Sequence, residues 1–173
     1  MKIATFTILS GLFLLLSSCS QPDTSQAQAQ LSDSTPKPSP TLEAIKPYQA
    51  TFLIFTHNLQ RNFNSSMYHY QSEDVYLEPG NTSQIHLTKS GITWADFFQT
   101  LPFSVTADCL TTGSGEKFCS QDNQVLSFYL NEELRQDVLD ITIEPDDQLL
   151  ISFGTKNSQY LQSQINILKK LAK

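Results

Sequence analysis

Two histidines, His69 and His86, lie on segments separated by the turn at Pro79-Gly80. Imidazole nitrogens bind copper or zinc when several ligands converge on one ion. The two rings could approach across a sheet, with Met67 or Glu78 completing the site. The chain contains no His-x-His or His-x-x-x-His pair, and isolated histidines are more often surface or hydrogen-bonded side chains. His69 and His86 are therefore candidate metal ligands, with an ordinary structural role as the alternative.

Carboxylates occur as adjacent pairs at Glu73-Asp74, Glu132-Glu133 and Asp146-Asp147. A general acid and a general base must face one another across a cleft, and neighbours in a turn are more often solvated. The chain has no Gly-x-Ser-x-Gly nucleophile motif and no glycine-rich phosphate loop followed by lysine. We therefore predict a protein without catalytic activity and without a cofactor.

Cys109 and Cys119 flank a segment whose centre is Gly113-Ser114-Gly115. This centre indicates a turn, and its flanks suit two short strands, so the thiols can meet across a hairpin. A disulfide closing such a loop contributes about 3 kcal/mol to stability in the chain-entropy model. The alternative is a redox-active pair, but the Cys-x-x-Cys spacing typical of catalytic dithiols does not occur. We predict a structural disulfide.

The third cysteine, Cys19, closes a short apolar segment. Lys2 precedes an apolar stretch that runs from Ile3 to Leu16, which is the layout of a secretory signal. Leu16-Ser17-Ser18-Cys19 resembles the lipobox of bacterial lipoproteins, which implies that Cys19 is lipidated and becomes the new N-terminus. Residues 1–18 are then a removable signal peptide. The implied location is the extracytoplasmic side of a membrane in the cell envelope, with acyl chains such as palmitate as the anchor.

The composition limits the possible partners. Without residues 1–18, 155 residues remain, with 10 basic and 17 acidic side chains and a net charge of −7. Nucleic-acid binding depends on lysine and arginine displacing counterions from phosphates. We therefore predict no nucleic-acid partner, and we expect membrane attachment to rest on the lipid.

Residues 19–46 are rich in Ser, Thr, Gln, Ala and Pro, and they contain almost no large apolar side chains. Such a composition cannot bury enough surface to order itself, so it indicates a disordered tether. A single folded domain is expected over residues 47–173. Its predicted strands are the apolar or alternating segments 51–55, 74–78, 84–88, 125–130, 141–143 and 148–153, and residues 58–64 are expected to form a loop.

The helical period occurs in two places. Thr93-Trp94-Ala95-Asp96 fits a capping box in which aspartate replaces the usual glutamate or glutamine. An apolar face follows at helical spacing and ends at Pro102; it contains Trp94, Phe97, Phe98 and Leu101. This face could be a ligand platform, but it is more typical of a helix buried on a sheet. Residues 158–173 predict a C-terminal helix with lysines in its last turn.

Strands with one helix in the middle of the domain predict an α+β fold. It comprises a small mixed sheet with one central helix packed on it, a disulfide-closed hairpin and a C-terminal helix. The stretch Phe128 to Gly154 resembles the second half of β-grasp domains, with Glu132 and Asp147 replacing turn glycines of the small sulfur-carrier members. Residues 85–87 and 91–102 also resemble part of an uncharacterised prokaryotic extracytoplasmic family, which implies location and fold but no activity.

The sequence thus favours a lipid-anchored extracytoplasmic binding or interaction module without catalytic activity. Its partner, a protein or a small molecule, is not specified. Tyr68, Tyr70 and Tyr76 are the candidate interaction surface, because tyrosine is favoured at interfaces. Tyrosine is also common in strands, which is the alternative for these three. The rival function is a copper- or zinc-binding lipoprotein that uses His69 and His86.

Overall fold

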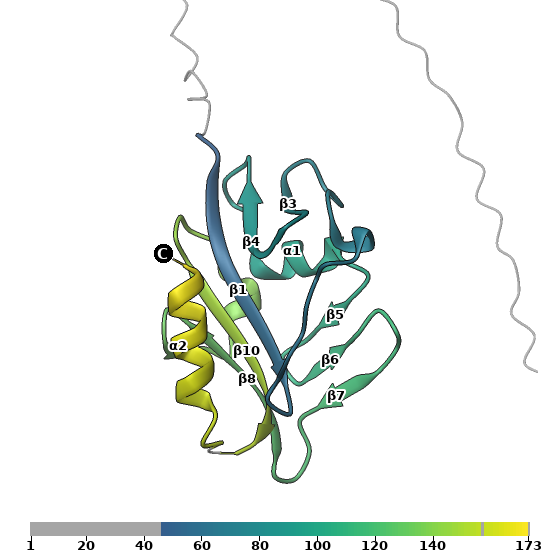
Figure 1. Cartoon of the computed structure of the whole chain (residues 1–173), viewed down its shortest axis with the longest axis vertical. Helices are drawn as coiled ribbons and strands as arrows, with labels where there is room; N and C mark the ends of the chain where they lie inside the picture. Colours follow the sequence, from purple (N-terminus) through teal and green to yellow (C-terminus); the bar gives the residue numbers. More distant parts are fainter. Residues whose placement is uncertain (1–45, 157, 173) are drawn as a thin grey trace, which may run out of the picture. The chain divides into compact units, whose positions relative to one another are not determined.

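The computed structural model describes residues 46–156 and 158–172 (Figure 1). The predicted signal peptide, the lipidation site Cys19 and the predicted tether up to residue 45 lie outside the described residues. They stay predictions. None of the helices within the described ranges is long and apolar enough to cross a bilayer.

The main sheet has seven strands in the spatial order β3-β4-β1-β10-β8-β9, with β2 paired to β1. The strands are β1 (Tyr48–Thr56), β2 (Leu59–Gln60), β3 (Val75–Glu78), β4 (Asn81–Leu87), β8 (Gln124–Leu130), β9 (Glu133–Leu134) and β10 (Gln148–Thr155). The first and last strands, β1 and β10, lie side by side and parallel, and every other pairing in this sheet is antiparallel. The predicted mixed sheet is therefore confirmed, with more strands than expected.

A second, three-stranded sheet carries the cysteines. It consists of β5 (Ser104–Val105), β6 (Cys109–Thr111) and β7 (Lys117–Cys119). Cys109 and Cys119 are paired residues of the β6–β7 hairpin and form a disulfide, as predicted. The Gly-Ser-Gly turn positions them, because the register of a hairpin is fixed by its turn.

Helix α1 (Trp94–Thr100) begins where the capping box predicts it. The Thr93 hydroxyl accepts a hydrogen bond from the Asp96 backbone N–H, and the Asp96 carboxylate accepts one from the Thr93 backbone N–H. Helix α2 (Leu161–Leu171) lies in the predicted C-terminal segment and ends with Lys169 and Lys170 in its last turn. Two short 3₁₀ helices, η1 (Ser66–Tyr68) and η2 (Val138–Asp140), complete the elements.

The two helices pack on opposite faces of the main sheet. Alternate residues of β1, among them Ala50, Phe52 and Ile54, join the large core cluster that contains Trp94, Phe97 and Phe98 of α1. The intervening residues Leu53 and Phe55 join a smaller cluster with Leu150 of β10 and Ile165 and Leu168 of α2. Because side chains alternate across a strand, successive residues of β1 contribute to two different cores, one on each face of the sheet.

Several turns place ordinary L-residues in the left-handed region. The two-residue loop between β8 and β9 has positive φ at both Asn131 (51°) and Glu132 (74°), as a type I′ hairpin requires. In the turn before β10, the residue with positive φ is Asp146 (65°). The resemblance to β-grasp domains instead places Asp147 at the position of the turn glycine.

Two expected segments differ from the structure. Residues 58–64, expected as a loop, include β2, which pairs with the end of β1 through a tight turn at His57 and Asn58. Residues 141–143, expected as a strand, make one bridge, between Thr142 and Thr93, after η2. The β1–β2 pairing is short and local, whereas the Thr93–Thr142 bridge joins segments far apart in the chain, and hydrophobic periodicity detects neither.

Candidate functional site

Side chains from three adjacent strands form a polar and aromatic row on the sheet face that carries α2. His86 of β4 lies opposite Gln49 of β1 and opposite Tyr76 of β3. Gln84 lies two residues before His86 and so points to the same face. Gln49 is exposed and the other three are half-buried, whereas their strand neighbours Ile85 and Leu87 are buried against the opposite core. The row is the part of this face that the α2 cluster leaves open.

A chain of hydrogen bonds orders the polar members of this row. The Gln84 amide donates from Nε2 to Gln49 Oε1 at 2.6 Å, and the Gln49 amide lies 3.2 Å, Nε2 to Nδ1, from the His86 ring. With the Gln49 oxygen accepting, its Nε2 is the donor, so His86 Nδ1 accepts and the ring proton sits on Nε2. That nitrogen lies 3.5 Å from Glu78 Oε2. The network therefore fixes the tautomer and orientation of His86.

Three rings stand next to one another at the outer end of the row. The rings of Tyr76 and His86 are stacked, with centroids 5.4 Å apart and an angle of 8° between the planes. Tyr70 follows beyond β3, 5.5 Å from Tyr76 with an angle of 37°. We call Tyr70, Tyr76 and His86 the aromatic ladder. Each ring packs against its neighbour, and Tyr70 is the solvent-exposed end of the ladder.

Tyr70 combines high exposure with an unfavourable backbone conformation. Tyr70 is 60% exposed. Its φ is +53°, which lies in a region that bulky L-residues rarely adopt. Its backbone N–H donates to the Leu77 carbonyl of β3, at 3.1 Å, which fixes the segment along the edge of the sheet. The Tyr70 ring is therefore exposed to solvent at a position where a tyrosine strains the backbone by about 1 kcal/mol. A residue that tolerates a positive φ would relieve this strain.

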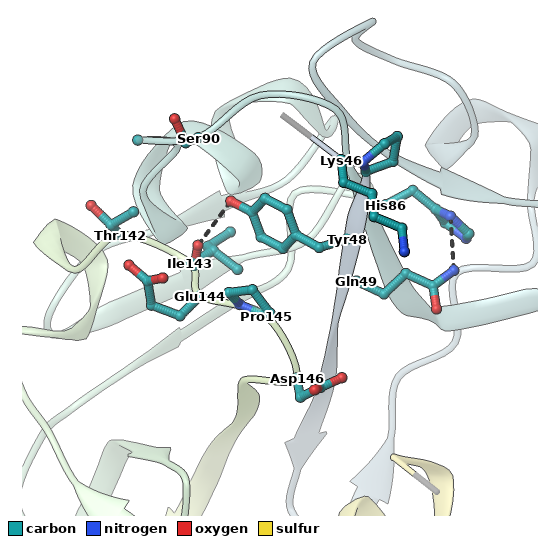
Figure 2. Close-up of a pocket in the computed structure, with 12 residues that line it drawn as sticks. Lys46, Tyr48, Gln49, His86, Ser90, Thr142, Ile143, Glu144, Pro145 and Asp146 are labelled. Carbon is teal, nitrogen blue, oxygen red and sulfur yellow. Dashed lines mark hydrogen bonds between the residues drawn. The ribbon is translucent and has the colours of Figure 1, made fainter. Parts of the chain in front are cut away.

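The ladder adjoins an open hollow of about 660 Å³ (Figure 2). Its walls come from the start of β1, the end of β4 and the loop before β10. Figure 2 shows the Gln49 amide directed at the His86 ring on one side and the Tyr48 hydroxyl directed at the Ile143 carbonyl on the other. The lining residues are Lys46, Pro47, Tyr48, Gln49, His86, Ser90, Gly91 and residues 142–146. His86 and Gln49 therefore belong to both the ladder row and the hollow.

Hydrogen bonds of Asp147 and Tyr48 set the wall formed by residues 142–146. The buried Asp147 carboxylate accepts from the Asn131 amide at 2.8 Å and from the Glu144 backbone N–H at 2.9 Å. The Tyr48 hydroxyl donates to the Ile143 carbonyl at 3.0 Å. Burial, followed by the carboxylates of Glu144 and Asp147, raises the pKa of the Tyr48 phenol above its ordinary value. Tyr48 thus stays protonated, as this hydrogen bond requires.

The structure divides the three tyrosines predicted as an interaction surface. Tyr70 and Tyr76 lie together in the ladder, with Tyr70 exposed and Tyr76 half-buried. Tyr68 is half-buried elsewhere: its ring meets Phe63 edge-on at 5.0 Å and packs against the large core. Their predicted role as an interaction surface stays a prediction.

The two candidate metal ligands have different surroundings. The His69 ring nitrogen Nε2 lies 2.9 Å from the Phe63 carbonyl oxygen and must donate to it, because a carbonyl only accepts. His86 is held by Gln49 and Glu78, as described above. Residues 46–156 and 158–172 contain no group of three His, Cys, Asp or Glu side chains arranged to hold a metal ion. Metal binding by His69 and His86 stays a prediction.

Sequence reasoning missed Gln49, Gln84 and the hollow. A signal for the two glutamines was present, because Gln84-Ile85-His86-Leu87 alternates polar and apolar residues and so places Gln84 and His86 on one face. The pairing of Gln49 with His86 depends on the β1–β4 register, which joins residues 37 positions apart. The hollow depends on a loop that follows its β4 wall by about 50 residues and its β1 wall by about 95, and local periodicity carries no such information.

Comparison with known proteins gives no matching family model, no matching curated protein and no matching solved structure.

Proposed function

We propose that this protein is a lipid-anchored, extracytoplasmic binding module of the cell envelope, without catalytic activity, and that the aromatic ladder is its recognition surface. The anchor rests on Leu16-Ser17-Ser18-Cys19 and on the composition of residues 19–46. A disulfide between Cys109 and Cys119 fits an oxidising, extracytoplasmic compartment. The expected partner is a small molecule or a protein reached from the membrane surface.

The arrangement of polar groups around the hollow supports binding rather than catalysis. Asp147 accepts from Asn131 and from the Glu144 N–H, and Tyr48 donates to a backbone carbonyl. These bonds build the wall of the hollow and leave the groups satisfied within the protein. Within the described chain, Ser90 of the hollow makes no side-chain hydrogen bond to a histidine, as an activated nucleophile would.

Tyr70 is the observation that carries the proposal. An exposed aromatic ring adds apolar surface to solvent, and its left-handed backbone adds strain, so neither feature stabilises the fold. A contact that forms on binding explains both, because tyrosine gives a large, rigid contact area at low entropic cost. The adjoining hollow of about 660 Å³ lies within the size range of small-molecule sites, about 300–1,000 Å³.

Tyrosine footprinting tests whether the ladder is occupied in the cell. Intact envelopes and the purified full-length protein are nitrated with tetranitromethane, and each tyrosine is quantified by peptide mass spectrometry. We expect protection of Tyr70 in envelopes relative to the purified protein. Tyr160, which is 45% exposed at the N-terminus of α2, is the matched control and should react equally in both. Equal nitration of Tyr70 in both samples would contradict the proposed recognition surface.

The anchor is tested separately with Cys19→Ala. This change removes the thioether-forming side chain, so we expect the protein to move from the membrane pellet to the soluble fraction. Cys109→Ala leaves Cys19 intact and is the control for loss of a cysteine as such. Retention of the Cys19→Ala protein on membranes would rule out lipidation as the anchor.

A further inference from the structure

We infer that the aromatic ladder binds a neutral saccharide, with one pyranose ring resting on Tyr70 at the open end. The inference rests on the proposed binding function and specifies its ligand class. It follows from three properties of the ladder: which charges are already paired, which groups remain free, and how rigidly those groups are held.

The charges next to the ladder disfavour an ionic ligand. Glu78 lies 3.5 Å from the His86 ring nitrogen, and Asp74 pairs with Lys89 at 3.3 Å. A cationic ligand would therefore have to displace existing partners. An anionic ligand would approach the Glu78 carboxylate, whose charge the neutral His86 ring does not cancel, and would be repelled by it. A neutral ligand meets neither obstacle.

The groups that remain free match a ring that carries hydroxyls. The outer face of Tyr70 is open, and within the described part of the chain no hydrogen bond forms at the hydroxyls of Tyr70 or Tyr76. A phenol hydroxyl both donates and accepts, as does a sugar hydroxyl, so the two can pair in either direction. The C–H face of a pyranose is apolar and flat enough to rest on an aromatic ring. The ladder thus offers a platform and hydroxyl partners side by side.

The ladder is also held rigid before any ligand arrives. His86 is fixed through Gln49 and Gln84, and Tyr76 stacks on His86. The Tyr70 backbone is held by its bond to Leu77, and its ring lies 5.5 Å from that of Tyr76. Rigid rings lose little conformational entropy on binding, and weak ligands such as single sugars depend on this saving. His86 and Gln49 also line the hollow, so a linear oligosaccharide on Tyr70 and Tyr76 continues toward it.

The test is calorimetric titration of the purified full-length protein with neutral tetrasaccharides: cellotetraose, maltotetraose and tetra-N-acetylchitotetraose. Triarginine and tetragalacturonate serve as cationic and anionic comparators. We expect at least one neutral probe to bind more tightly than both charged ones. Tyr70→Asn removes the ring and puts in a residue that tolerates a positive φ; it should weaken binding by about tenfold or more. Tyr70→Phe keeps the ring and should weaken it by less than about threefold.

Tyr160→Ala is the control, because Tyr160 lies near Asn58, at the end of β1 away from Gln49. Equal effects of Tyr70→Asn and Tyr160→Ala would overturn the inference, as would the absence of binding to all neutral probes. Tighter binding of a charged probe would also overturn it. Any of these results combined with protection of Tyr70 in envelopes would reject the saccharide and leave the proposed binding function standing. Protection that survives washing of the envelopes would identify an immobilised glycan as the source, and protection lost on washing a soluble sugar.

Discussion

The two faces of the main sheet are built from the same strands and differ in how completely they are covered. On the α1 face, Phe52 is fully buried and its ring lies within 5.1–6.0 Å of three others, those of Phe63, Phe97 and Phe98. On the α2 face, the helix covers Leu53, Phe55 and Leu150 but leaves Gln49, Gln84, His86 and Tyr76 exposed or half-buried. One face is closed by apolar packing, and the other is partly open and polar.

This difference assigns most of the stability to the α1 face and the proposed recognition to the open part of the α2 face. Buried apolar area stabilises a fold by roughly 25 cal/mol per Å², so the α1 face holds most of the stabilising contacts. The open part of the α2 face buries little and is ordered by hydrogen bonds and ring stacking. Substitutions on the two faces should therefore have effects of different size and kind, which the following variants measure.

The largest effect is expected for Phe52→Ala. Phe52 is 0% exposed at the centre of the α1-face core, so the change leaves a cavity and should reduce the free energy of unfolding by about 3–5 kcal/mol. Urea denaturation followed by circular dichroism measures it. Leu59→Ala, at a residue 65% exposed, is the control and should change stability by less than about 0.5 kcal/mol. A loss below 1.5 kcal/mol for Phe52→Ala would show that this face is not the main core.

An intermediate effect is expected for Gln164→Ala on α2. Gln164 is 2% exposed; its amide oxygen accepts from the Ser152 hydroxyl at 2.7 Å, and its nitrogen donates to Asn58 at 3.2 Å. Removing the Gln164 amide deletes both hydrogen bonds, to the half-buried Ser152 and to the exposed Asn58, which should cost about 1–2 kcal/mol. Gln162→Ala, on the exposed side of the same helix, is the control. Equal stability of the two variants would mean that this buried bond does not hold α2 on the sheet.

A smaller, pH-dependent effect is expected for Asp96→Ala at the start of α1. Hydrogen bonds from the Thr93 backbone N–H and then from its hydroxyl lower the pKa of Asp96 below its ordinary value. Its stabilising effect is therefore complete above that ordinary value, about 3.9, and is lost as the pH falls through the lower folded value. At pH 7 the variant should be less stable by about 1 kcal/mol. The difference should shrink in urea titrations as the pH falls below about 3.9, and a constant difference would exclude the carboxylate as its source.

The smallest effect on stability is expected for Tyr70→Asn. Loss of the contact with Tyr76 is offset by relief of backbone strain, so the free energy of unfolding should change by less than about 0.5 kcal/mol. Thermal and urea unfolding measure it, with Tyr70→Phe retaining both ring and strain. A loss above 2 kcal/mol would assign Tyr70 to the core and remove the contrast between the faces.

The local elements were predictable because their signals lie within a few residues. The capping box at Thr93 and Asp96 gave the start of α1, and the spacing of Trp94, Phe97 and Phe98 gave its buried face. The hairpin that joins Cys109 to Cys119 was predictable from its Gly-Ser-Gly turn. The turns with unusual residues were harder, because Glu132 adopts a positive φ that its residue type disfavours.

Only some residues of the candidate site were predictable from the sequence, and their arrangement was not. The sequence singles out Tyr70, Tyr76 and His86, with His86 as a candidate metal ligand and Tyr68 grouped with the other two tyrosines. It does not predict that the rings of Tyr70, Tyr76 and His86 lie against one another. Their partners follow from pairing between strands far apart in the chain, as Gln49 with His86 shows. The sequence specifies which side of a strand each residue occupies, but not which strand becomes its neighbour.

The amino-acid sequence by itself determined the α+β class, the capped helix and the disulfide hairpin, because turn chemistry, capping and periodicity act over short range. The tertiary structure alone decided which half of the α2 face stays open. It also decided that Tyr70, Tyr76 and His86 stack into one ladder beside a hollow. The reason is that strand order and register depend on the burial of the whole core, to which residues from Ala50 to Phe153 contribute together.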